Sequence, residues 1–203
     1  MIAELKPEEK EIAEVVPEDC VVILTQTGDI KRVPSKSFRV QRKNGKGVKT
    51  EDDAILSTIA TNTDDVLMAF TNKGKMYRLL VDNIPVGTNA SKGVRIGTLI
   101  NMEPGEKVIA TTSLHRNTNA EYVLFITKQG LVKKTLLEEY TKVKRSTGIA
   151  AIKIKDGDSI ANVTFVKDED LVLETKKGMA IHFATKDITP IGRVTAGVKG
   201  IKL

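Results

Sequence analysis

The chain of 203 residues has no tryptophan, a single cysteine and few aromatic side chains of any kind. The lone Cys20 excludes an intramolecular disulfide framework and a cysteine-based zinc site. Aromatic residues make up 4% of the chain, which is few for a protein that stacks single-stranded bases, so any nucleic-acid partner would be a duplex. No apolar run approaches the ~20 residues of a membrane helix, and the first 20 residues do not resemble a signal peptide. We therefore expect a soluble, cytoplasmic protein with no membrane partner.

The sequence also lacks the common enzyme motifs. It contains no GxxxxGK[ST] phosphate-binding loop, no HExxH zinc motif and no GxSxG nucleophile turn. Its two histidines, His115 and His182, have no paired catalytic group in the sequence, and such histidines rarely form a site. Neighbouring acids such as Asp64 and Asp65 are typical of turns, whereas a metal site needs converging ligands. We expect no catalytic residue, no metal and no cofactor in this stretch of chain, so the stretch alone is not an enzyme.

Positive charge is concentrated in one part of the chain. The formal net charge is +6, but residues 1–20 hold seven acids and two lysines, which leaves +11 on the other 183 residues. Residues 30–50, the basic block, contain eight lysines and arginines and no acid. Such a block repels itself unless a polyanion binds to it, although a solvated surface is the alternative interpretation. The alternation of these cations with Val33, Phe38 and Val40 favours ordered structure and a polyanionic partner.

Four segments of the chain share one pattern, an apolar strand that ends in Thr-x-x-Gly. Their threonines are spaced by 46, 56 and 48 residues and lie at Thr25, Thr71, Thr127 and Thr175. A second glycine follows each turn glycine after 18 or 19 residues, at Gly47, Gly93, Gly148 and Gly197. A period of this length built from short strands indicates propeller blades. We therefore expect an all-β, propeller-like array with repeats at approximately 18–63, 64–119, 120–166 and 167–203.

The repeats have two further positions in common. The fourth residue after each turn glycine can carry a positive charge, and these residues are Arg32, Arg78, Lys134 and His182. Acidic turns at Gly105–Glu106 and Gly157–Asp158 precede apolar segments that we expect to lead into the next repeat. The fourth repeat stops before such a turn, so we expect an open arc of four sheets that is a piece of a longer propeller.

Residues 41–47, which we name the basic box, read Gln-Arg-Lys-Asn-Gly-Lys-Gly. The box resembles the Q-R-R-G-G-K-G pattern of the C-terminal domain of the DNA gyrase A subunit, and residues 70–74, 127–134 and 197–203 also resemble that family. Two positions depart from the pattern. Lys43 keeps the charge of the family's arginine but loses its bidentate fork, and Asn44 replaces a glycine, which asparagine does best at a positive φ.

The resemblance implies a β-pinwheel in which neighbouring blades exchange strands and duplex DNA wraps around a basic rim. Such domains usually have six blades, of which four repeats are visible here. The family also implies a breakage-and-reunion domain before residues 1–17, which would be the linker, and a separate partner chain, the B subunit. ATP and Mg²⁺ would belong to those other parts. We expect the present chain to be a monomer that binds, bends and wraps duplex DNA without sequence specificity and so supports negative supercoiling.

Two alternatives remain at this point. The related topoisomerase IV domain has a degenerate box or none, so the nearly intact box favours gyrase. A protein-interaction propeller would need exposed apolar loops, and the loops here are polar and basic.

The expected DNA contacts are the box and the cations that recur along the repeats. These residues are Lys31, Arg32, Arg39, Gln41, Arg42, Lys43, Gly45, Lys46, Gly47, Lys49, Arg78, Lys92, Arg95, Lys133, Lys134, Lys144, Arg145, Arg193 and Lys199.

Overall fold

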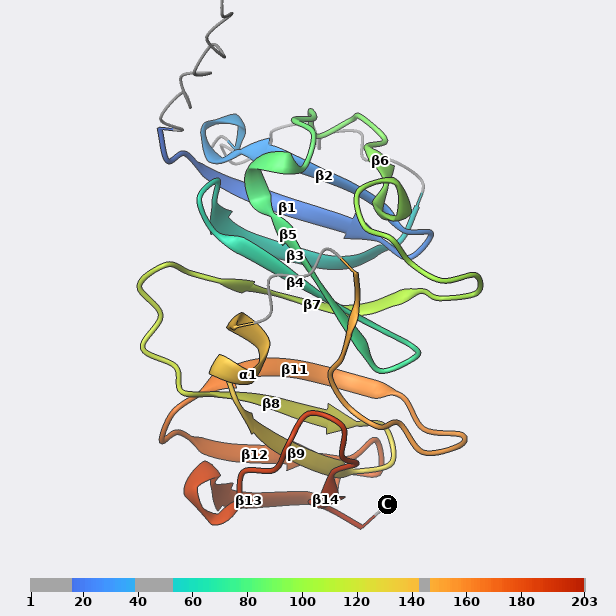
Figure 1. The fold of residues 1–203 in the computed structure, drawn as a ribbon, viewed down its shortest axis with the longest axis vertical. Helices are drawn as coiled ribbons and strands as arrows, with labels where there is room; N and C mark the ends of the chain where they lie inside the picture. The colour runs from blue at the N-terminus through green and yellow to red at the C-terminus, as the bar shows by residue number, and fades with distance from the viewer. Residues whose placement is uncertain (1–15, 39–52, 143–146, 203) are drawn as a thin grey trace, which may run out of the picture.

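The protein is described by a computed structural model in which residues 16–38, 53–142 and 147–202 are placed. These residues form three four-stranded antiparallel sheets and one two-stranded sheet, which follow one another along the long axis (Figure 1). The longest helix among them, α1 (Glu138–Thr141), has four residues. The prediction of an all-β, propeller-like array is confirmed. No helix in the described ranges is long and apolar enough to span a bilayer.

The first three sheets have the same strand arrangement. The first sheet has the order β3-β1-β2-β6, formed by β3 (Ile55–Asn62), β1 (Asp19–Thr25), β2 (Asp29–Pro34) and β6 (Val94–Arg95). The second sheet has the order β10-β5-β4-β7, formed by β10 (Ile149–Ala150), β5 (Lys75–Leu80), β4 (Val66–Thr71) and β7 (Val108–Leu114). The third has the order β11-β8-β9-β14, formed by β11 (Ile160–Val166), β8 (Tyr122–Thr127), β9 (Leu131–Leu136) and β14 (Val198–Lys199). The fourth consists of β12 (Asp170–Glu174) and β13 (Ala180–Ala184).

Each Thr-x-x-Gly segment is the turn of a hairpin at the centre of its sheet. The turn glycines, such as Gly28 at φ +92° and Gly74 at φ +70°, lie in the left-handed region, where a side chain would be strained. The threonine explains the other half of the motif. Its carbonyl accepts from the glycine N–H and its hydroxyl from the next residue's N–H, as in the Asp29 N to Thr25 Oγ1 bond of 3.0 Å. The motif therefore satisfies the turn's own polar groups.

The second glycine of the second, third and fourth repeats marks an exchange of strands between repeats; Gly47 of the first lies outside the described residues. β6 belongs to the second repeat in sequence but pairs with β2, β10 of the third repeat pairs with β5, and β14 of the fourth pairs with β9. A Cβ on Gly93 would lie 2.5 Å from the Ile30 carbonyl oxygen, and one on Gly148 would lie 2.4 Å from the Tyr77 ring. Only glycine allows so close an approach. The regular spacing of these glycines therefore indicates where one repeat packs against the next.

The segments after the acidic turns are strands, as expected. β7 and β11 complete their own sheets, by pairing with β4 and β8 respectively, before the chain passes into the next repeat. They form one edge of each sheet, and these edges meet, since β3 contacts β7 and β7 contacts β11. Hydrogen bonds of 2.7 Å between Ser57 and Thr111 and of 2.6 Å between Thr61 and Ser113 join them. The exchange strands therefore occupy the opposite, outer edges.

Apolar side chains fill the spaces between consecutive sheets. Between the second and third sheets, Phe70 and Phe125 pack edge to face with ring centroids 5.3 Å apart. β4 and β8, the central strands of the second and third sheets, are buried on both faces, as their continuous apolar runs predict. In the end sheets β1 alternates between buried and half-buried residues and β12 is mostly exposed, because each has a neighbouring sheet on one side only. The first and fourth sheets lie at opposite ends of the molecule (Figure 1), so the array is open, as predicted.

Candidate nucleic-acid interface

Three segments carry the exchange strands of one repeat onto the sheet of the repeat before it. We name residues 81–95, 138–150 and 185–199 the exchange segments. Each begins with a helical turn, namely η2 (Val81–Asn83), α1 or η4 (Thr185–Asp187), and ends in β6, β10 or β14. The edge strands β3, β7 and β11 face one another on the inner side of the array. The exchange strands lie at the other edges, so the exchange segments follow one another along the outer side.

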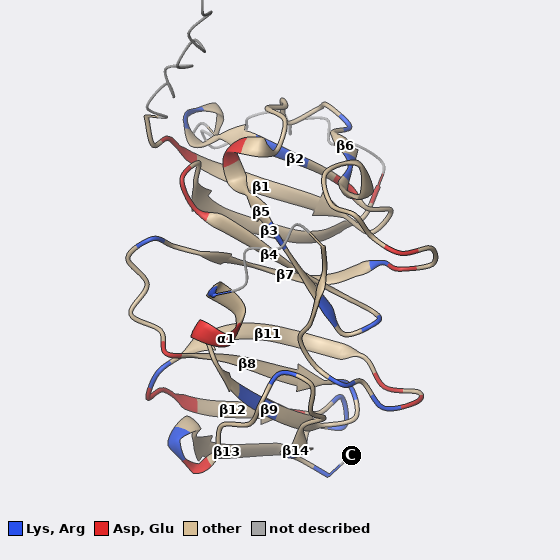
Figure 2. Ribbon diagram, viewed as in Figure 1, with Lys and Arg blue, Asp and Glu red and all other residues tan. Residues whose placement is uncertain are grey.

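The exchange segments carry exposed positive charge. Five exposed cations of the described residues lie in them, at Lys92, Arg95, Lys142, Lys186 and Lys199, together with the exposed acids Glu138 and Asp187. The predicted contacts Lys92, Arg95 and Lys199 are thus on the surface, and Figure 2 shows basic residues in the loop around β6. Arg193 is half-buried, because its guanidinium donates to the Ala150 carbonyl at 3.3 Å. The predicted contacts Lys144 and Arg145 lie outside the described residues.

A buried carboxylate orients two of these cations. Asp29 is 4% exposed in its side chain and lies 3.1 Å from Arg95 Nε and 3.8 Å from Lys92 Nζ. The cations themselves remain 56% and 68% exposed. Because more than half of each cation's side chain stays in solvent, its remaining N–H groups can meet a phosphate while the pair with Asp29 is kept.

The basic box and its flanks lie outside the described residues. They occupy 39–52 and follow the turn η1 (Ser35–Ser37) in the chain. The predicted contacts concerned are Arg39, Gln41, Arg42, Lys43, Gly45, Lys46, Gly47 and Lys49.

Three predicted contacts require correction, because their side chains lie in the interior. Lys31, Lys133 and Lys134 are each at most 6% exposed. The ammonium of Lys133 donates to Thr135 Oγ1 at 2.6 Å and to the Ala151 carbonyl at 3.0 Å, and burial lowers its pKa to about 8. Burial also lowers the pKa of Lys134, whose Nζ donates to the Thr185 carbonyl at 2.7 Å. The sequence pattern could not distinguish these lysines from surface ones, because their burial depends on which distant segment of the chain covers each side chain.

Two further predicted contacts lie between sheets. Arg32 pairs with Asp82 at 2.9 Å and donates from Nε to the Ile84 carbonyl at 2.7 Å. Arg78 donates to the Thr141 carbonyl at 3.0 Å. Each reaches from its own sheet to the exchange segment of the following repeat, so contacts within the protein use their donors.

Sequence reasoning overlooked exposed lysines at the hairpin tips. Lys73, Lys128, Lys176 and Lys177 occupy the variable positions of the Thr-x-x-Gly motif. Their place in the motif could have identified them as exposed. The neighbouring turns, however, carry acids, and Lys73 lies 3.3 Å from Glu103. Figure 2 shows both signs of charge at this end of the sheets, which makes it a poor match for a polyanion.

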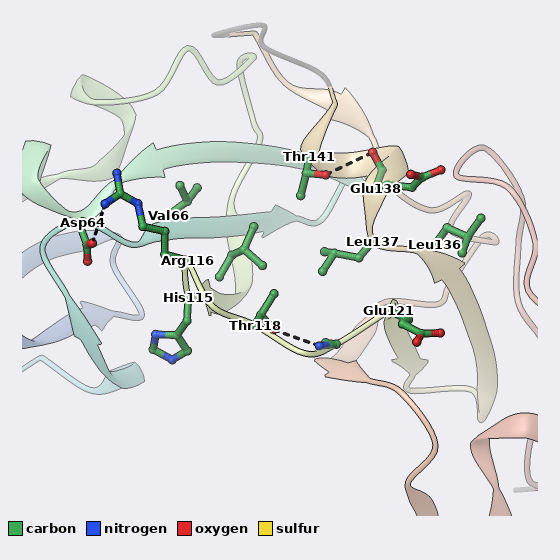
Figure 3. Close-up of a pocket in the computed structure, with 12 residues that line it drawn as sticks. Asp64, Val66, His115, Arg116, Thr118, Glu121, Leu136, Leu137, Glu138 and Thr141 are labelled. Carbon is green, nitrogen blue, oxygen red and sulfur yellow. Dashed lines mark hydrogen bonds and ion pairs between the residues drawn. The ribbon is translucent and has the colours of Figure 1, made fainter.

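A pocket of about 600 Å³ lies between the second and third sheets (Figure 3). Its apolar lining includes Val66, Leu114 and Leu137. Three acids line it, Asp64, Glu121 and Glu138, against one arginine, Arg116. His115 lies beside it and pairs through Nδ1 with Asp65 at 2.6 Å. Burial raises the pKa of Asp65, but hydrogen bonds from Asn62, Thr61 and His115 outweigh it and lower the pKa. The acidic lining disfavours phosphate, so we do not assign this pocket to nucleic acid.

Comparisons with known proteins agree with this architecture. The chain is 36% identical over 196 residues to the DNA gyrase A subunit of Clostridium acetobutylicum and 38% identical over 204 residues to that of Chlamydia muridarum. These matches cover 94% and 96% of the chain but only 24% of each relative, so the chain spans about a quarter of their length.

Solved structures show the same arrangement of sheets. A DNA gyrase A C-terminal domain superimposes with a TM-score of 0.76 at 29% identity, over 91% of this chain and 61% of that one. The C-terminal domain of a DNA topoisomerase IV gives a TM-score of 0.71 at 32% identity, over 93% and 58%. The family model of the DNA gyrase C-terminal domain, a beta-propeller, matches residues 21–62, 65–114, 121–167 and 169–203. With all four repeats matched, the chain belongs to the DNA gyrase A C-terminal domain family.

Proposed function

We propose that the chain binds duplex DNA through the basic box and along its exchange segments, as a DNA-binding part of a type IIA topoisomerase. The observation that carries the proposal is the recurrence of exposed cations in segments that follow one another on the outer edges of successive sheets. Phosphates lie at regular intervals along a duplex, and each cation that neutralises one releases condensed counterions. A row of basic segments therefore fits a polyanion better than an isolated patch would.

Binding is without sequence specificity in this proposal. Reading the major groove takes a helix or a two-stranded ribbon that enters it. The longest helix in the described ranges, α1, has four residues, and the hairpins β1–β2, β4–β5 and β8–β9 are held inside four-stranded sheets. Contacts to the backbone position a protein on DNA but carry no direct sequence information. Spread over an arc, they would also bend the duplex, and further contacts would offset the deformation energy.

The relatives extend the proposal to the whole protein. In a full-length gyrase A subunit, the wrapped DNA would be presented to a breakage-and-reunion domain, which works with the B subunit, and strand passage would introduce negative supercoils. The part we assign to this chain is the wrapping and not the bond chemistry.

A mobility-shift assay with plain duplex at two salt concentrations tests the proposal. We expect the triple variant Arg42→Ala, Lys43→Ala, Lys46→Ala to bind more weakly than the parent, and the slope of log affinity against log salt to fall by up to about 0.9 for each lost phosphate contact. The matched control is the triple variant Lys73→Ala, Lys128→Ala, Lys176→Ala, which removes the same charge at the hairpin tips. The control should keep the parental slope. Equal losses in both variants would mean that only net charge matters.

The second candidate function is a contact surface for protein. Val172 and Met179 of the fourth repeat are 64% and 63% exposed, and exposed apolar surface can mark an interaction site. This chain covers only 61% of the solved gyrase A domain, however, so a further repeat of such a domain would be an equally good partner for this surface. Weak duplex binding that does not respond to salt would favour this function over DNA binding.

A further inference from the structure

One side chain in each of the first three repeats fastens its sheet to the repeat that follows. These are Arg32, Arg78 and Lys134, which we name the clamp residues; all three are the fourth residue after a turn glycine. Each donates to one or two backbone carbonyls at the helical turn that opens the next exchange segment. These carbonyls belong to the turn itself or, for Ile84, to the residue just after it. The acceptors are Asp82 and Ile84 at η2, Thr141 in α1 and Thr185 in η4.

The position of the acceptors gives the contact its strength. The Asp82, Ile84 and Thr141 carbonyls lie in the last residues of a helical turn or just after it, where carbonyls lack a partner within the turn and a cation is well matched to them. The Thr185 carbonyl, at the start of η4, accepts from both Lys134 Nζ and Ile188 N. Arg32 makes the fullest contact, because it also pairs with the Asp82 carboxylate at 2.9 Å, and its side chain is 14% exposed. Lys134 is 3% exposed and also lies 4.6 Å above the Tyr122 ring. Partly or fully buried contacts of this kind are screened little by salt.

The backbone around two clamp residues holds the same exchange segment. Arg32 N donates to the Pro85 carbonyl at 3.1 Å, and Gly87 N donates to the Arg32 carbonyl at 2.8 Å. In the third sheet, Ile191 N donates to the Lys134 carbonyl at 2.8 Å. Each exchange segment is thus fixed near its start by a clamp residue and at its end by the exchange strand. Both attachments must hold for the basic loop between them to keep its place.

We infer that the clamp residues are positioning residues for DNA: they set the angle between successive sheets, and so the spacing of the basic exchange segments, without contacting phosphate themselves. This inference rests on the proposed function. It assigns two kinds of cation to two tasks. Exposed cations such as Arg95 neutralise phosphates, whereas Arg32 determines whether neighbouring segments lie on one curved path.

The fourth repeat provides an internal comparison. His182 occupies the clamp position on the fourth sheet, where the described residues offer no following repeat. It is exposed, and its Nε2 lies 3.1 Å from Asp170 of its own sheet. The burial seen at the other clamp positions therefore depends on the following exchange segment.

The experiment compares Arg32→Met with Arg95→Met. Arg32→Met removes charge and donors but keeps an unbranched stem, and Arg95→Met does the same in an exposed segment. Two DNA readouts separate the roles: the salt slope of binding to a duplex of about 12 bp, which spans few blades, and the bend of a longer duplex measured by energy transfer between its ends. For Arg32→Met we expect an unchanged salt slope on the short duplex and reduced bending of the long one. For Arg95→Met we expect the slope to fall by up to about 0.9, with bending of bound DNA retained.

Rescue by Arg32→Lys tests the chemistry of the clamp. Lys134 shows that an ammonium can hold a helical turn through one carbonyl, so Arg32→Lys should recover at least half of the bending lost in Arg32→Met. If Arg32→Met does not fold, as judged by circular dichroism, Lys134→Met with Lys134→Arg as rescue serves the same purpose at the next junction but one. A salt slope lowered by Arg32→Met, or bending left unchanged by it, would overturn the inference.

A distance measurement without DNA keeps this inference separate from the proposed function. Spin labels at Ser37→Cys on the first repeat and Asn117→Cys on the second, both at exposed positions, report the angle between sheets. Cys20 is 2% exposed and burial raises the pKa of its thiol, so it should label slowly. We expect Arg32→Met to broaden the distance distribution and Arg95→Met to leave it narrow. If the parent failed to bind duplex, the proposed function would fail, while an unchanged distribution in Arg32→Met would refute the clamp itself.

Discussion

Lys133 is fully buried in the fold, although it was expected at the surface. Its ammonium lies in the apolar space between the second and third sheets, 5.0 Å from the centroid of the Phe125 ring. Besides Thr135 and Ala151, its Nζ lies 3.3 Å from the Tyr140 hydroxyl. The buried charge is tolerated because it has hydrogen-bond partners, but burial still lowers the pKa to about 8.

This pKa predicts a pH dependence of stability. The folded-state pKa of about 8 lies below the value of about 10.4 for an unfolded lysine, so between these two values the unfolded chain binds more protons than the folded one. The free energy of unfolding should therefore gain a rising contribution from Lys133 as the pH increases from about 8 to 10. In Lys133→Met this contribution disappears. Urea denaturation of both proteins at pH 8, 9 and 10 measures it, and parallel pH profiles would show that Lys133 is not the group responsible.

At the scale of elements, the exchange strand depends on contacts that a single methyl group can obstruct. Gly148, just before β10, lies against the Tyr77 ring, whose hydroxyl donates to the buried Glu106 carboxylate at 2.7 Å. Thr71 Oγ1 donates to the other oxygen of Glu106 at 2.6 Å. The ring therefore cannot easily move away from β10.

Replacing Gly148 by alanine should destabilise the junction between the second and third repeats. The new Cβ would lie 2.4 Å from the Tyr77 ring, and overpacking of this kind costs about 1–3 kcal/mol. Gly192→Ala is the control, since a Cβ there meets nothing within 4 Å, and its effect should stay within about 0.5 kcal/mol. Chemical denaturation compares the two variants. Similar midpoints would mean that the exchange strand shifts to accept the methyl group.

At the scale of the whole molecule, the four sheets form an open array with basic segments along the outer edges. The solved gyrase A C-terminal domain is longer, because this chain covers 61% of it. Bending a duplex of 20–30 bp costs on the order of 1–6 kcal/mol, and that cost is offset only while further contacts follow along the path.

We therefore expect this chain to constrain less superhelical writhe per molecule than a chimera extended by the remaining part of that domain. Nicked circular DNA religated in the presence of each protein, followed by analysis of its linking number, measures the difference. The box triple variant should give a smaller change than the parent. An equal change for chain and chimera would show that four repeats complete the wrap.

The repeats, the hairpins and the family could be predicted from the sequence, because the motifs that identify them depend on local chemistry. Thr71 and Gly74 form their turn through bonds within a few residues, and an apolar run between turns reads as a buried strand wherever it lies. The regular spacing of Gly93 and Gly148 could also be recognised in the sequence. The reason for these glycines, the close approach of another repeat, could not. The resemblance supplied the idea of strand exchange that the spacing alone could not.

Which cations are exposed could be seen only in the tertiary structure. Lys133 and Lys134 follow each other in sequence, yet one lies in the core between the second and third sheets and the other reaches η4 in the fourth repeat. Arg32 and Arg95 carry the same charge, but only Arg95 keeps most of its side chain in solvent. Exposure depends on which distant segment covers a side chain, and that follows from the pairing of repeats rather than from the residue or its neighbours in sequence.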